Sequence, residues 1–302
     1  IEKELKHYTK HFKGKSVLCN CDDPRVSNFF HYFSFNFERL QLKKLTSVCY
    51  QNKQIDMFSQ NIEQKAIYLE YRGDKNNNQV PDIEEIGIQE LNGDGDFRSD
   101  ECIELLKSAD IVVTNPPFSL FRDFMKVLVE HEKKFLIIGN MNALTYKEIF
   151  PLFQENKTWF GPSISSGDTE FGVPERYPLN AAGSRVDEEG NKFIRVKGVR
   201  WFTNLEFKGR KTDLVLYKKY DPDEYPKYDN FDAIDVSKTA EIPEDYDGPM
   251  GVPITFMDKY NPDQFEILGN LGSYAPDGYS LVSKIFINGK KKFKRILIRR
   301  RS

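Results

Sequence analysis

The residues Asn115, Pro116, Pro117 and Phe118 combine groups that can hold an aromatic amine. The two prolines have no N–H groups and fix φ, and each favours extended geometry in the residue before it. The backbone therefore stays stiff and open, so that the Asn115 amide and a carbonyl can face a ligand. A plain strand-to-helix turn is the alternative, because proline is common at the start of a helix. That alternative explains one proline, but neither the asparagine before it nor the aromatic residue after it.

Methyl transfer to the exocyclic amine of a base is the chemistry that suits this arrangement. Such an amine is a poor nucleophile because its lone pair is delocalised into the ring, and it becomes more reactive when acceptors hold its hydrogens. Asn115 and the Pro116 carbonyl are two such acceptors. Phe118 can stack on the ring, an interaction of about 1–3 kcal/mol per base in nucleic-acid binders. A methyl sulfonium beside the amine would complete an in-line displacement, with catalysis coming mainly from positioning.

The elements around this motif predict a crevice at one edge of a parallel sheet. The apolar run 111–113 predicts a buried strand before the motif, and 119–134 predicts a helix after it. Ligands of open α/β sheets bind beyond the carboxyl ends of the strands. Two further predicted strand ends carry acids, Asp22 with Asp23 and then Asp96, so these acids would line one crevice with Asn115. Helix capping is an equally good interpretation of Asp22 and Asp23.

The order of predicted elements indicates the fold class. A strand at 15–23, a helix at 27–42 capped by Ser27 and a strand at 43–50 form a βαβ unit. Alternating strands and helices continue to residue 157, which predicts a doubly wound, Rossmann-like α/β sheet. The further strands are expected at 66–71, 86–91 and 134–140, and the further helices at 99–110 and 146–157.

The texture of the chain changes after residue 158. Glycine, proline, aromatic and β-branched residues predict antiparallel strands and long loops, including a strand at 212–220. Asn288-Gly289 predicts a hairpin turn between two short apolar runs. We therefore expect a catalytic domain over residues 1–217 and a C-terminal, β-rich target-recognition region over residues 218–302.

Composition excludes several classes of protein. The 302 residues are 39% hydrophobic and 30% charged, and no apolar run approaches the roughly 20 residues of a membrane span. Four cysteines without dense spacing fit a reducing cytoplasm, and "CNC" at 19–21 lacks a second ligand pair, so no metal site is predicted. The net charge of −2 is segregated, with a basic segment at 284–301 and an acidic one at 221–247. The loop after the first strand has neither a dinucleotide fingerprint nor a phosphate-binding loop.

Four blocks of sequence resemble the EcoRI-type adenine-specific DNA methyltransferases, and the resemblance spans nearly the whole chain. "NPPF" by itself is shared with adenosylmethionine enzymes that methylate RNA or protein glutamine, whereas two longer blocks, the second and the fourth, are far more specific. The resemblance implies site-specific transfer of a methyl group from S-adenosylmethionine to N6 of a flipped-out adenine, by a restriction-modification or solitary enzyme. The blocks are "VLCNCDDPRVSNFFHYFSFNFERL", "GDGDFRSDECIELLKSADIVVTNPPFSLF", "GVRWFTNLE" and "GPMGVPITFMDKYNPDQFEILG".

The resemblance also implies roles for particular residues. The catalytic tetrad would consist of Asn115, Pro116, Pro117 and Phe118. Asn115 would also border the cofactor. Asp96 and Phe97 would meet the adenine of the cofactor. The loop that would hold its methionine end consists of Cys21, Asp22, Asp23 and Pro24.

The chain departs from the pattern of such enzymes at two places. No acid ends the second strand to bind the ribose, since Tyr50, Gln51 and Asn52 stand there. A phenylalanine-bearing cofactor motif normally precedes the first strand, and residues 1–14 hold no convincing copy. We expect that motif upstream of Ile1 or absent from this chain.

The substrate implied is double-stranded DNA, from which the target adenine must be rotated at a cost of a few kcal/mol. The basic hairpin is the candidate for phosphate contact, through Lys290, Lys291, Lys292 and Lys294. A solvated sheet edge is the alternative role of these lysines. Arg200 either reaches phosphate or covers Trp201, which we expect in the core.

These observations predict a cytoplasmic monomer without membrane contact, with a cognate restriction endonuclease as a possible partner at the same DNA site. Two other functions remain open at the level of sequence. One keeps the cofactor and methylates RNA or a protein glutamine. The other is a DNA-binding relative that has lost catalysis, although the intact "NPPF" and "GDGDF" blocks argue against it.

Overall fold

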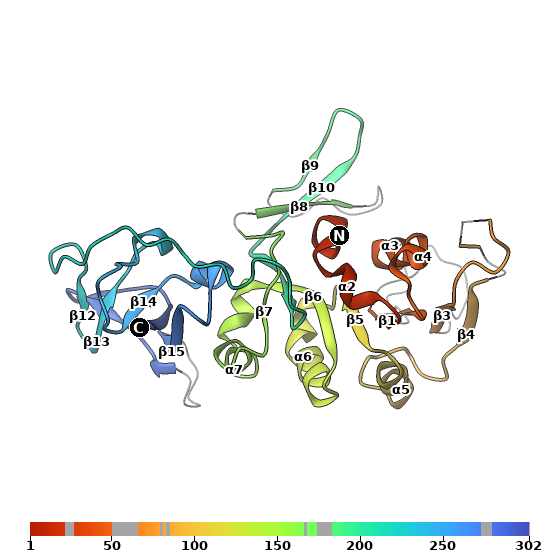
Figure 1. Ribbon diagram of the computed structural model, residues 1–302, viewed down its shortest axis with the longest axis horizontal. Coiled ribbons are helices and arrows are strands. Elements are labelled where there is room, and N and C mark those ends of the chain that lie inside the picture. Colours follow the sequence, from red (N-terminus) through yellow and green to blue (C-terminus); the bar gives the residue numbers. More distant parts are fainter. Residues whose placement is uncertain are drawn as a thin grey trace, which may run out of the picture. The chain divides into compact units, whose positions relative to one another are not determined.

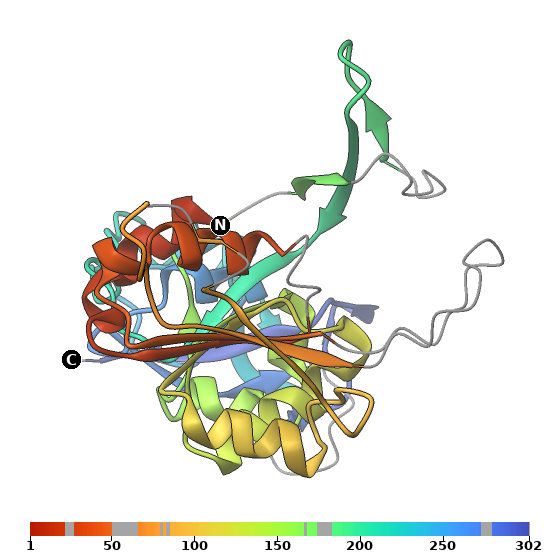
Figure 2. The same ribbon diagram turned by 90° about the vertical axis from the view of Figure 1, so that its right-hand side faces the viewer.

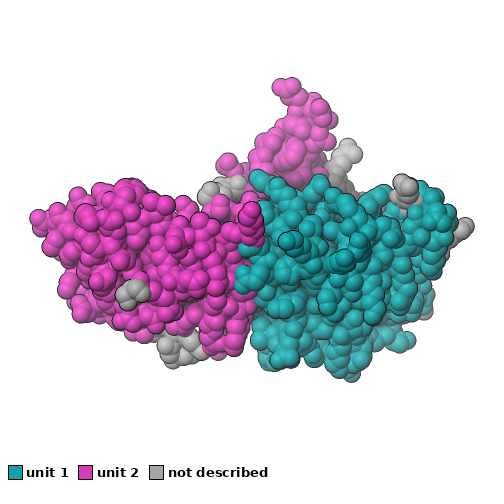
Figure 3. Space-filling model, in the orientation of Figure 1, with its two compact units in different colours: residues 1–139, 201–207 teal, residues 140–200, 208–302 magenta. Residues whose placement is uncertain are grey.

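The computed structural model of the protein describes residues 1–21, 27–49, 66–78, 81–82, 85–165, 168–173, 183–272 and 280–301. The chain forms two compact units (Figure 3). Unit 1 consists of residues 1–139 and 201–207, and unit 2 of residues 140–200 and 208–302. Both units therefore take residues from the range 1–217 that the sequence assigns to one catalytic domain.

Unit 1 is built on a mixed sheet that has helices on both faces (Figures 1 and 2). Its strands lie in the order β4-β3-β2-β1-β5-β6-β11. The neighbours β1 and β2, β1 and β5, and β5 and β6 are parallel, whereas β3 pairs antiparallel with β2 and β4. The predicted α/β class is confirmed, and a strand forms in each segment of unit 1 that the sequence predicts as one. The strands are β1 (Ser16–Cys19), β2 (Lys44–Cys49), β3 (Ile67–Tyr71), β4 (Gly87–Glu90), β5 (Ile111–Thr114), β6 (Lys134–Asn140) and β11 (Val199–Thr203).

The helices of unit 1 begin and end where local side chains allow. The hydroxyl of Ser27 accepts a hydrogen bond from the Phe30 amide, and that of Ser99 from the Cys102 amide, so both helix starts follow from capping. The predicted helix 27–42 breaks at Asn36, whose amide group donates to the Tyr32 carbonyl and so competes with the helical bonds. The helical elements are α1 (Glu2–Leu5), η1 (Lys6–Tyr8), α2 (Thr9–Phe12), α3 (Asn28–Phe35), α4 (Phe37–Leu40), α5 (Asp100–Ser108), η2 (Phe118–Leu120) and α6 (Phe121–Glu130).

Close packing fixes the start of α6 against the sheet. Phe121, Phe124, Met125 and Leu128 are buried at the spacing of one helix face. A Cβ on Gly139 in β6 would lie 2.5 Å from the Phe121 ring, so only glycine lets this ring approach the strand. The first turn of α6 is therefore held in place, and with it the end of the segment that follows β5.

Unit 2 contains a six-stranded sheet in the order β12-β13-β14-β19-β15-β16, a three-stranded sheet in the order β8-β10-β9 and the hairpin β17-β18. The strands are β7 (Trp159–Phe160), β8 (Asp168–Val173), β9 (Arg185–Val186), β10 (Lys192–Lys197), β12 (Lys227–Tyr228), β13 (Phe231–Asp235), β14 (Met250–Val252), β15 (Phe265–Leu271), β16 (Ser280–Val282), β17 (Phe286–Ile287), β18 (Lys290–Lys291) and β19 (Arg295–Arg300). The helical elements are η3 (Met141–Thr145), α7 (Phe150–Gln154), η4 (Thr239–Glu241) and η5 (Ile254–Lys259).

Three predictions for this part of the chain differ from the structure in extent or in type. The Asn288-Gly289 hairpin is confirmed, with φ of 51° and 70° at the turn, but it is short, because β19 leaves it to pair with β14 and β15. The prediction of a strand at 212–220 is wrong, since the Gln264 side chain bonds both the N–H and the carbonyl of Leu214 in place of a strand neighbour. Helix α7 is shorter than predicted, and Pro151 stands in its first turn.

Candidate active site

The predicted turn after β5 lies at the carboxyl ends of the parallel strands. The Thr114 hydroxyl donates to the Asn20 carbonyl, which ties the end of β5 to the end of β1. Pro116 is buried and anchors the turn, whereas Asn115 and Phe118 are exposed, Phe118 by 43% of its surface. The turn therefore presents its amide and its aromatic ring outward.

The Asn115 amide is available to a ligand. Its side chain makes no hydrogen bond to any residue that the structure describes. The chain then closes into η2, where the Leu120 amide donates to the Pro117 carbonyl over 2.9 Å. A short helical turn thus fixes Phe118 directly beside the exposed amide.

The loop that carries Asp96 is pinned to the first turn of α5. The Glu101 carboxylate accepts hydrogen bonds from the amides of Asn92 (3.1 Å) and Gly93 (2.8 Å). These bonds hold the pKa of the Glu101 carboxyl below its usual range. Gly95 has a φ of +79°, which favours glycine. The position of Asp96 is therefore set before any ligand arrives.

Arg98 holds the Asp96 carboxylate and links it to α6. The guanidinium donates to both oxygens of Asp96, over 2.9 and 2.7 Å, which lowers the pKa of that carboxyl. It also lies 3.5 Å from Asp123 in the first turn of α6. The buried Phe97 ring packs edge-on against Phe124 of the same helix, 5.1 Å between centroids. The Asp96 loop therefore packs against the first turn of α6. Because α6 follows η2 directly, this contact also links the Asp96 loop to the turn 115–118.

Part of the predicted cofactor loop lies outside the described residues. Cys21 is half-buried with a φ of 72°, but Asp22, Asp23 and Pro24 are not described, and neither are the ribose candidates Tyr50, Gln51 and Asn52.

Asn20 and Arg98 are candidate site residues that the sequence analysis did not single out. Asn20 directly follows β1, and its side-chain oxygen is buried and has no hydrogen-bond partner among the described residues. The only sequence signal for Asn20 is a polar residue in an apolar strand end. The signal for Arg98 is a basic residue two positions after Asp96.

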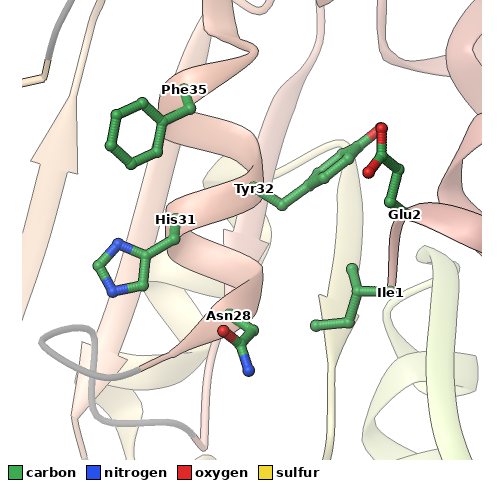
Figure 4. Close-up of a pocket in the computed structure, with 6 residues that line it drawn as sticks. All are labelled: Ile1, Glu2, Asn28, His31, Tyr32 and Phe35. Carbon is green, nitrogen blue, oxygen red and sulfur yellow. The ribbon is translucent and has the colours of Figure 1, made fainter.

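A separate hollow of about 370 Å³ lies between the N-terminal segment and α3 (Figure 4). The Tyr32 ring points toward the Glu2 carboxylate there. Burial raises the pKa of the Tyr32 hydroxyl. No residue predicted to act in catalysis or cofactor binding lines it; its walls are Ile1, Glu2, Asn28, His31, Tyr32 and Phe35.

The described residues hold no group of three or more histidine, cysteine, aspartate or glutamate side chains placed to bind a metal. No helix among them has the length and apolar character needed to cross a membrane.

The predicted DNA contacts differ in their exposure. Lys290 and Lys291 in β18 and Lys294 before β19 are exposed, and Lys292 is half-buried. None of these four ammonium groups forms an ion pair with a carboxylate in the described part of the chain. Their charge is therefore available to an external anion.

Arg200 does not fit the predicted contact with phosphate. Its side chain is 1% exposed and donates to both oxygens of Asp258 in η5, over 2.6 and 2.9 Å. Burial raises the pKa of the Asp258 carboxyl, against the opposing effect of Arg200. Arg200 thus has a structural role inside unit 2. Trp201 is 3% exposed and packs edge-on against Phe29, as expected for a core residue.

Comparison with known proteins supports the same conclusion as the motifs. The sequence model of the family "Adenine-specific methyltransferase EcoRI" matches residues 1–301. The chain is 48% identical to the Type II methyltransferase M.EcoRI of Escherichia coli over 301 residues, 99% of this chain and 90% of the relative. It is 38% identical to M.MgeORF184P of Mycoplasma genitalium, over 99% of this chain and 92% of the relative. The same identity relates it to M.MpnI of Mycoplasma pneumoniae, over 100% and 92%.

No solved structure gives a significant match. The family model, however, covers almost every residue, including both the turn 115–118 and the Asp96 loop. The chain belongs to the family of EcoRI-type adenine-specific methyltransferases.

Proposed function

We propose that this adenine-specific DNA methyltransferase moves a methyl group from S-adenosylmethionine to N6 of an adenine rotated out of duplex DNA, at a specific sequence. The observation that carries the proposal is the exposed Asn115 amide, without a described partner, at the carboxyl end of a parallel strand and before two prolines. A restriction-modification system is the setting that the Type II names of the relatives support. We propose that the enzyme acts as a cytoplasmic monomer, with an endonuclease of the same site as its genetic partner.

The residues at this sheet edge fit S-adenosylmethionine. The cofactor would bind at the carboxyl ends of the parallel strands β1, β5 and β6, because Rossmann-like sheets bind nucleotides there. Asp96 is ionised at neutral pH, since Arg98 lowers its pKa, and a carboxylate accepts hydrogen bonds from the amino group of an adenine. The buried side-chain oxygen of Asn20 is a further acceptor at the end of β1. The loop 21–24 would hold the methionine end.

The chain's own residues would orient the amine. The Asn115 side-chain oxygen and the Pro116 carbonyl would accept hydrogen bonds from its two N–H groups, which favours a tetrahedral nitrogen whose lone pair is directed at the methyl group. Phe118 stacks on the base and fixes the ring plane. The bound cofactor supplies the electrophilic methyl group. No covalent bond to the enzyme is needed, so the rate enhancement comes from positioning.

Phosphate contacts would hold the duplex while one base leaves the stack. Lys290, Lys291 and Lys294 are exposed and carry no described ion pair, and Lys292 adds a fourth charge to the same segment. Such contacts position the protein without reading bases.

Methyl transfer to duplex DNA, RNA and a glutamine peptide tests the proposal, followed by sequencing that maps modified adenines. We expect methylation of duplex DNA at adenines within one sequence. Methylation of RNA or peptide alone would contradict the proposed substrate, and cofactor binding without transfer to any of them would indicate a relative without catalysis.

The Asn115→Ala variant tests the site itself. Transfer should fall by about 10²–10³-fold or more, as when one oriented acceptor or donor is lost from other active sites. Cofactor affinity should stay near that of the parent because Asp96 and Asn20 are unchanged. Ser119→Ala is the matched control on an exposed neighbour. Transfer within a few-fold of the parent would exclude Asn115 as the residue that holds the amine.

A further inference from the structure

Phe293 is the most exposed large hydrophobic side chain among the described residues. It is 87% exposed, and it stands between Lys292 and Lys294 in the segment that joins β18 to β19. Burial of a phenylalanine ring against the protein would stabilise the fold, so an outward ring on an ordered segment needs a reason.

The backbone on both sides of this ring is fixed. The Lys292 amide donates to the Ile285 carbonyl over 2.9 Å. The Lys294 Cα lies 3.5 Å from where a Cβ on Gly272 would be, and Gly272 has a φ of +77°. Arg295 donates to the buried Asp235 carboxylate over 2.9 Å. The exposed ring therefore does not result from a frayed end.

The hairpin next to it is equally anchored. The amides of Asn288 and Gly289 donate to the two carboxylate oxygens of Asp229, over 2.9 and 2.8 Å. Ile285 and Ile287 are buried in a core cluster and Phe286 is half-buried, whereas the Phe293 ring is exposed. The segment therefore exposes the Phe293 ring to solvent, and four lysines stand within four residues of it.

We propose that Phe293 packs on the bases of bound DNA, as an apolar ring inserted between stacked base pairs. This inference rests on the proposed function and deepens it. Lysines without described carboxylate partners attract the phosphate backbone. An apolar ring among these lysines would contact the bases, which lie between the two backbones. Apolar wedges of this kind unstack base steps in architectural DNA-binding proteins. The lysines supply a salt-dependent part of the affinity, whereas Phe293 supplies a part that salt does not screen.

Tyr217 provides a matched control in the same unit. Its ring is 64% exposed and is followed directly by two lysines. Those lysines form ion pairs, Lys218 with Glu224 at 3.5 Å and Lys219 with Glu244 at 2.6 Å. An exposed aromatic beside neutralised cations should not contribute to DNA binding.

The test compares Phe293→Ala, Phe293→Trp and Tyr217→Ala by anisotropy titration. The probes are a duplex with the mapped methylation site and a random duplex, each at several salt concentrations. Phe293→Ala should weaken binding to the site by about 5-fold to 100-fold, the range of one base–aromatic stack, with an unchanged slope of log affinity against log salt. Phe293→Trp should retain the affinity, and Tyr217→Ala should bind like the parent.

Cofactor affinity of each variant, measured by calorimetry, shows that the variants are folded. Parental affinity of Phe293→Ala for DNA would overturn the inference, and so would a loss shared by Tyr217→Ala or a change of oligomeric state that accounts for the weaker binding. If the parent methylates DNA while Phe293→Ala behaves as the parent, only this inference fails. Failure of the parent to methylate DNA at all would instead overturn the proposed function.

Discussion

At the scale of single residues, the candidate site combines an open amide with a restrained carboxylate. Asn115 has no described partner, whereas Asp96 is held by Arg98, which also contacts Asp123. This difference suits two different tasks. An amide that orients a substrate amine must be free before the substrate arrives, and a carboxylate that binds a cofactor benefits from a fixed position and a charge that persists at neutral pH.

Replacement of Asp96 by alanine should weaken S-adenosylmethionine binding more than DNA binding. Loss of one hydrogen bond to a charged acceptor costs about 1.5–3 kcal/mol, which corresponds to roughly a 10-fold to 100-fold increase in the cofactor Kd. Because Arg98 lowers the pKa of Asp96, the carboxylate stays ionised to a lower pH than an ordinary aspartate, and its contribution should be lost only as the pH falls through that lowered pKa. Calorimetry with the cofactor, from neutral to acidic pH, measures both effects.

Asp123→Ala is the control for this prediction, since it removes the other carboxylate that contacts Arg98. Its cofactor affinity should remain near that of the parent. Equal affinity of the Asp96→Ala variant and the parent would reduce Asp96 to a turn residue that orders the start of α5.

At the scale of elements, the hairpin β17-β18 concentrates positive charge on an anchored support. The chain as a whole has a net charge of −2, so its field does not attract DNA uniformly. The hairpin instead offers exposed lysines on a turn that Asp229 holds by two backbone hydrogen bonds. Its edge position also fits a charged strand that blocks aggregation, and the salt dependence of DNA binding distinguishes the two roles.

Replacement of Lys290, Lys291, Lys292 and Lys294 by glutamine should flatten the salt dependence of DNA binding. Each phosphate neutralised contributes a slope of roughly −0.9 in log affinity against log salt, so the loss of several contacts is measurable by anisotropy titration. Target and random duplexes should weaken alike, because phosphate contacts carry no sequence information.

The control for the hairpin removes the same charge from lysines that already pair with acids. The four are Lys107, Lys126, Lys157 and Lys227, which lie near Glu104, Glu130, Glu155 and Asp232. This control variant should keep the parental slope. If the hairpin variant keeps the parental slope, these lysines do not contact phosphate and instead form a charged sheet edge.

At the scale of the whole molecule, buried polar pairs join segments that are distant in sequence. Within unit 2, Arg200 at the start of β11 and Asp258 in η5 are separated by 58 residues and form two hydrogen bonds in the core. Arg295 and Asp235 form a second such pair, which the Tyr228 hydroxyl joins by a 2.6 Å bond to Asp235. These pairs order the surroundings of the "MGVPITF" block rather than contact DNA.

Arg200→Met should destabilise the protein by about 3–5 kcal/mol at neutral pH, because it leaves the Asp258 carboxylate buried without its partner. Replacement of both residues, Arg200→Met with Asp258→Leu, should cost less, since no charge stays behind. Denaturant unfolding followed by circular dichroism measures the free energies. The salt dependence of DNA binding should be the same as in the parent at temperatures where the variant is folded.

The pH dependence of Arg200→Met has a definite sign. Burial raises the pKa of Asp258 in the folded state above its unfolded value. A raised pKa makes the folded state relatively more stable at low pH, where the carboxyl is neutral, and this advantage is lost as the pH rises through the folded pKa. The penalty of Arg200→Met should therefore be smaller at pH 5 than at pH 7. A penalty that is independent of pH, or a double variant no more stable than the single one, would contradict this account.

Features that depend on near neighbours could be predicted from the sequence alone. The caps at Ser27 and Ser99, the apolar strands and the turn at Asn288-Gly289 follow from hydrogen bonds and side-chain periods within a few residues. The "NPPF" turn belongs to the same class, because two adjacent prolines restrict the chain wherever they stand. The family was also evident at this level, since its blocks are contiguous in sequence.

Features that depend on distant partners could not be predicted, because they form only when the whole chain is folded. Leu214 is kept out of a strand by Gln264, Arg200 is buried by Asp258, and residues 295–300 lie inside a sheet rather than in an exposed hairpin arm. A local pattern of apolar and basic residues is compatible with either outcome in each case. Which one forms depends on the surface that the rest of the chain brings to the segment, and on the free-energy cost of leaving a buried charge or backbone group without a partner.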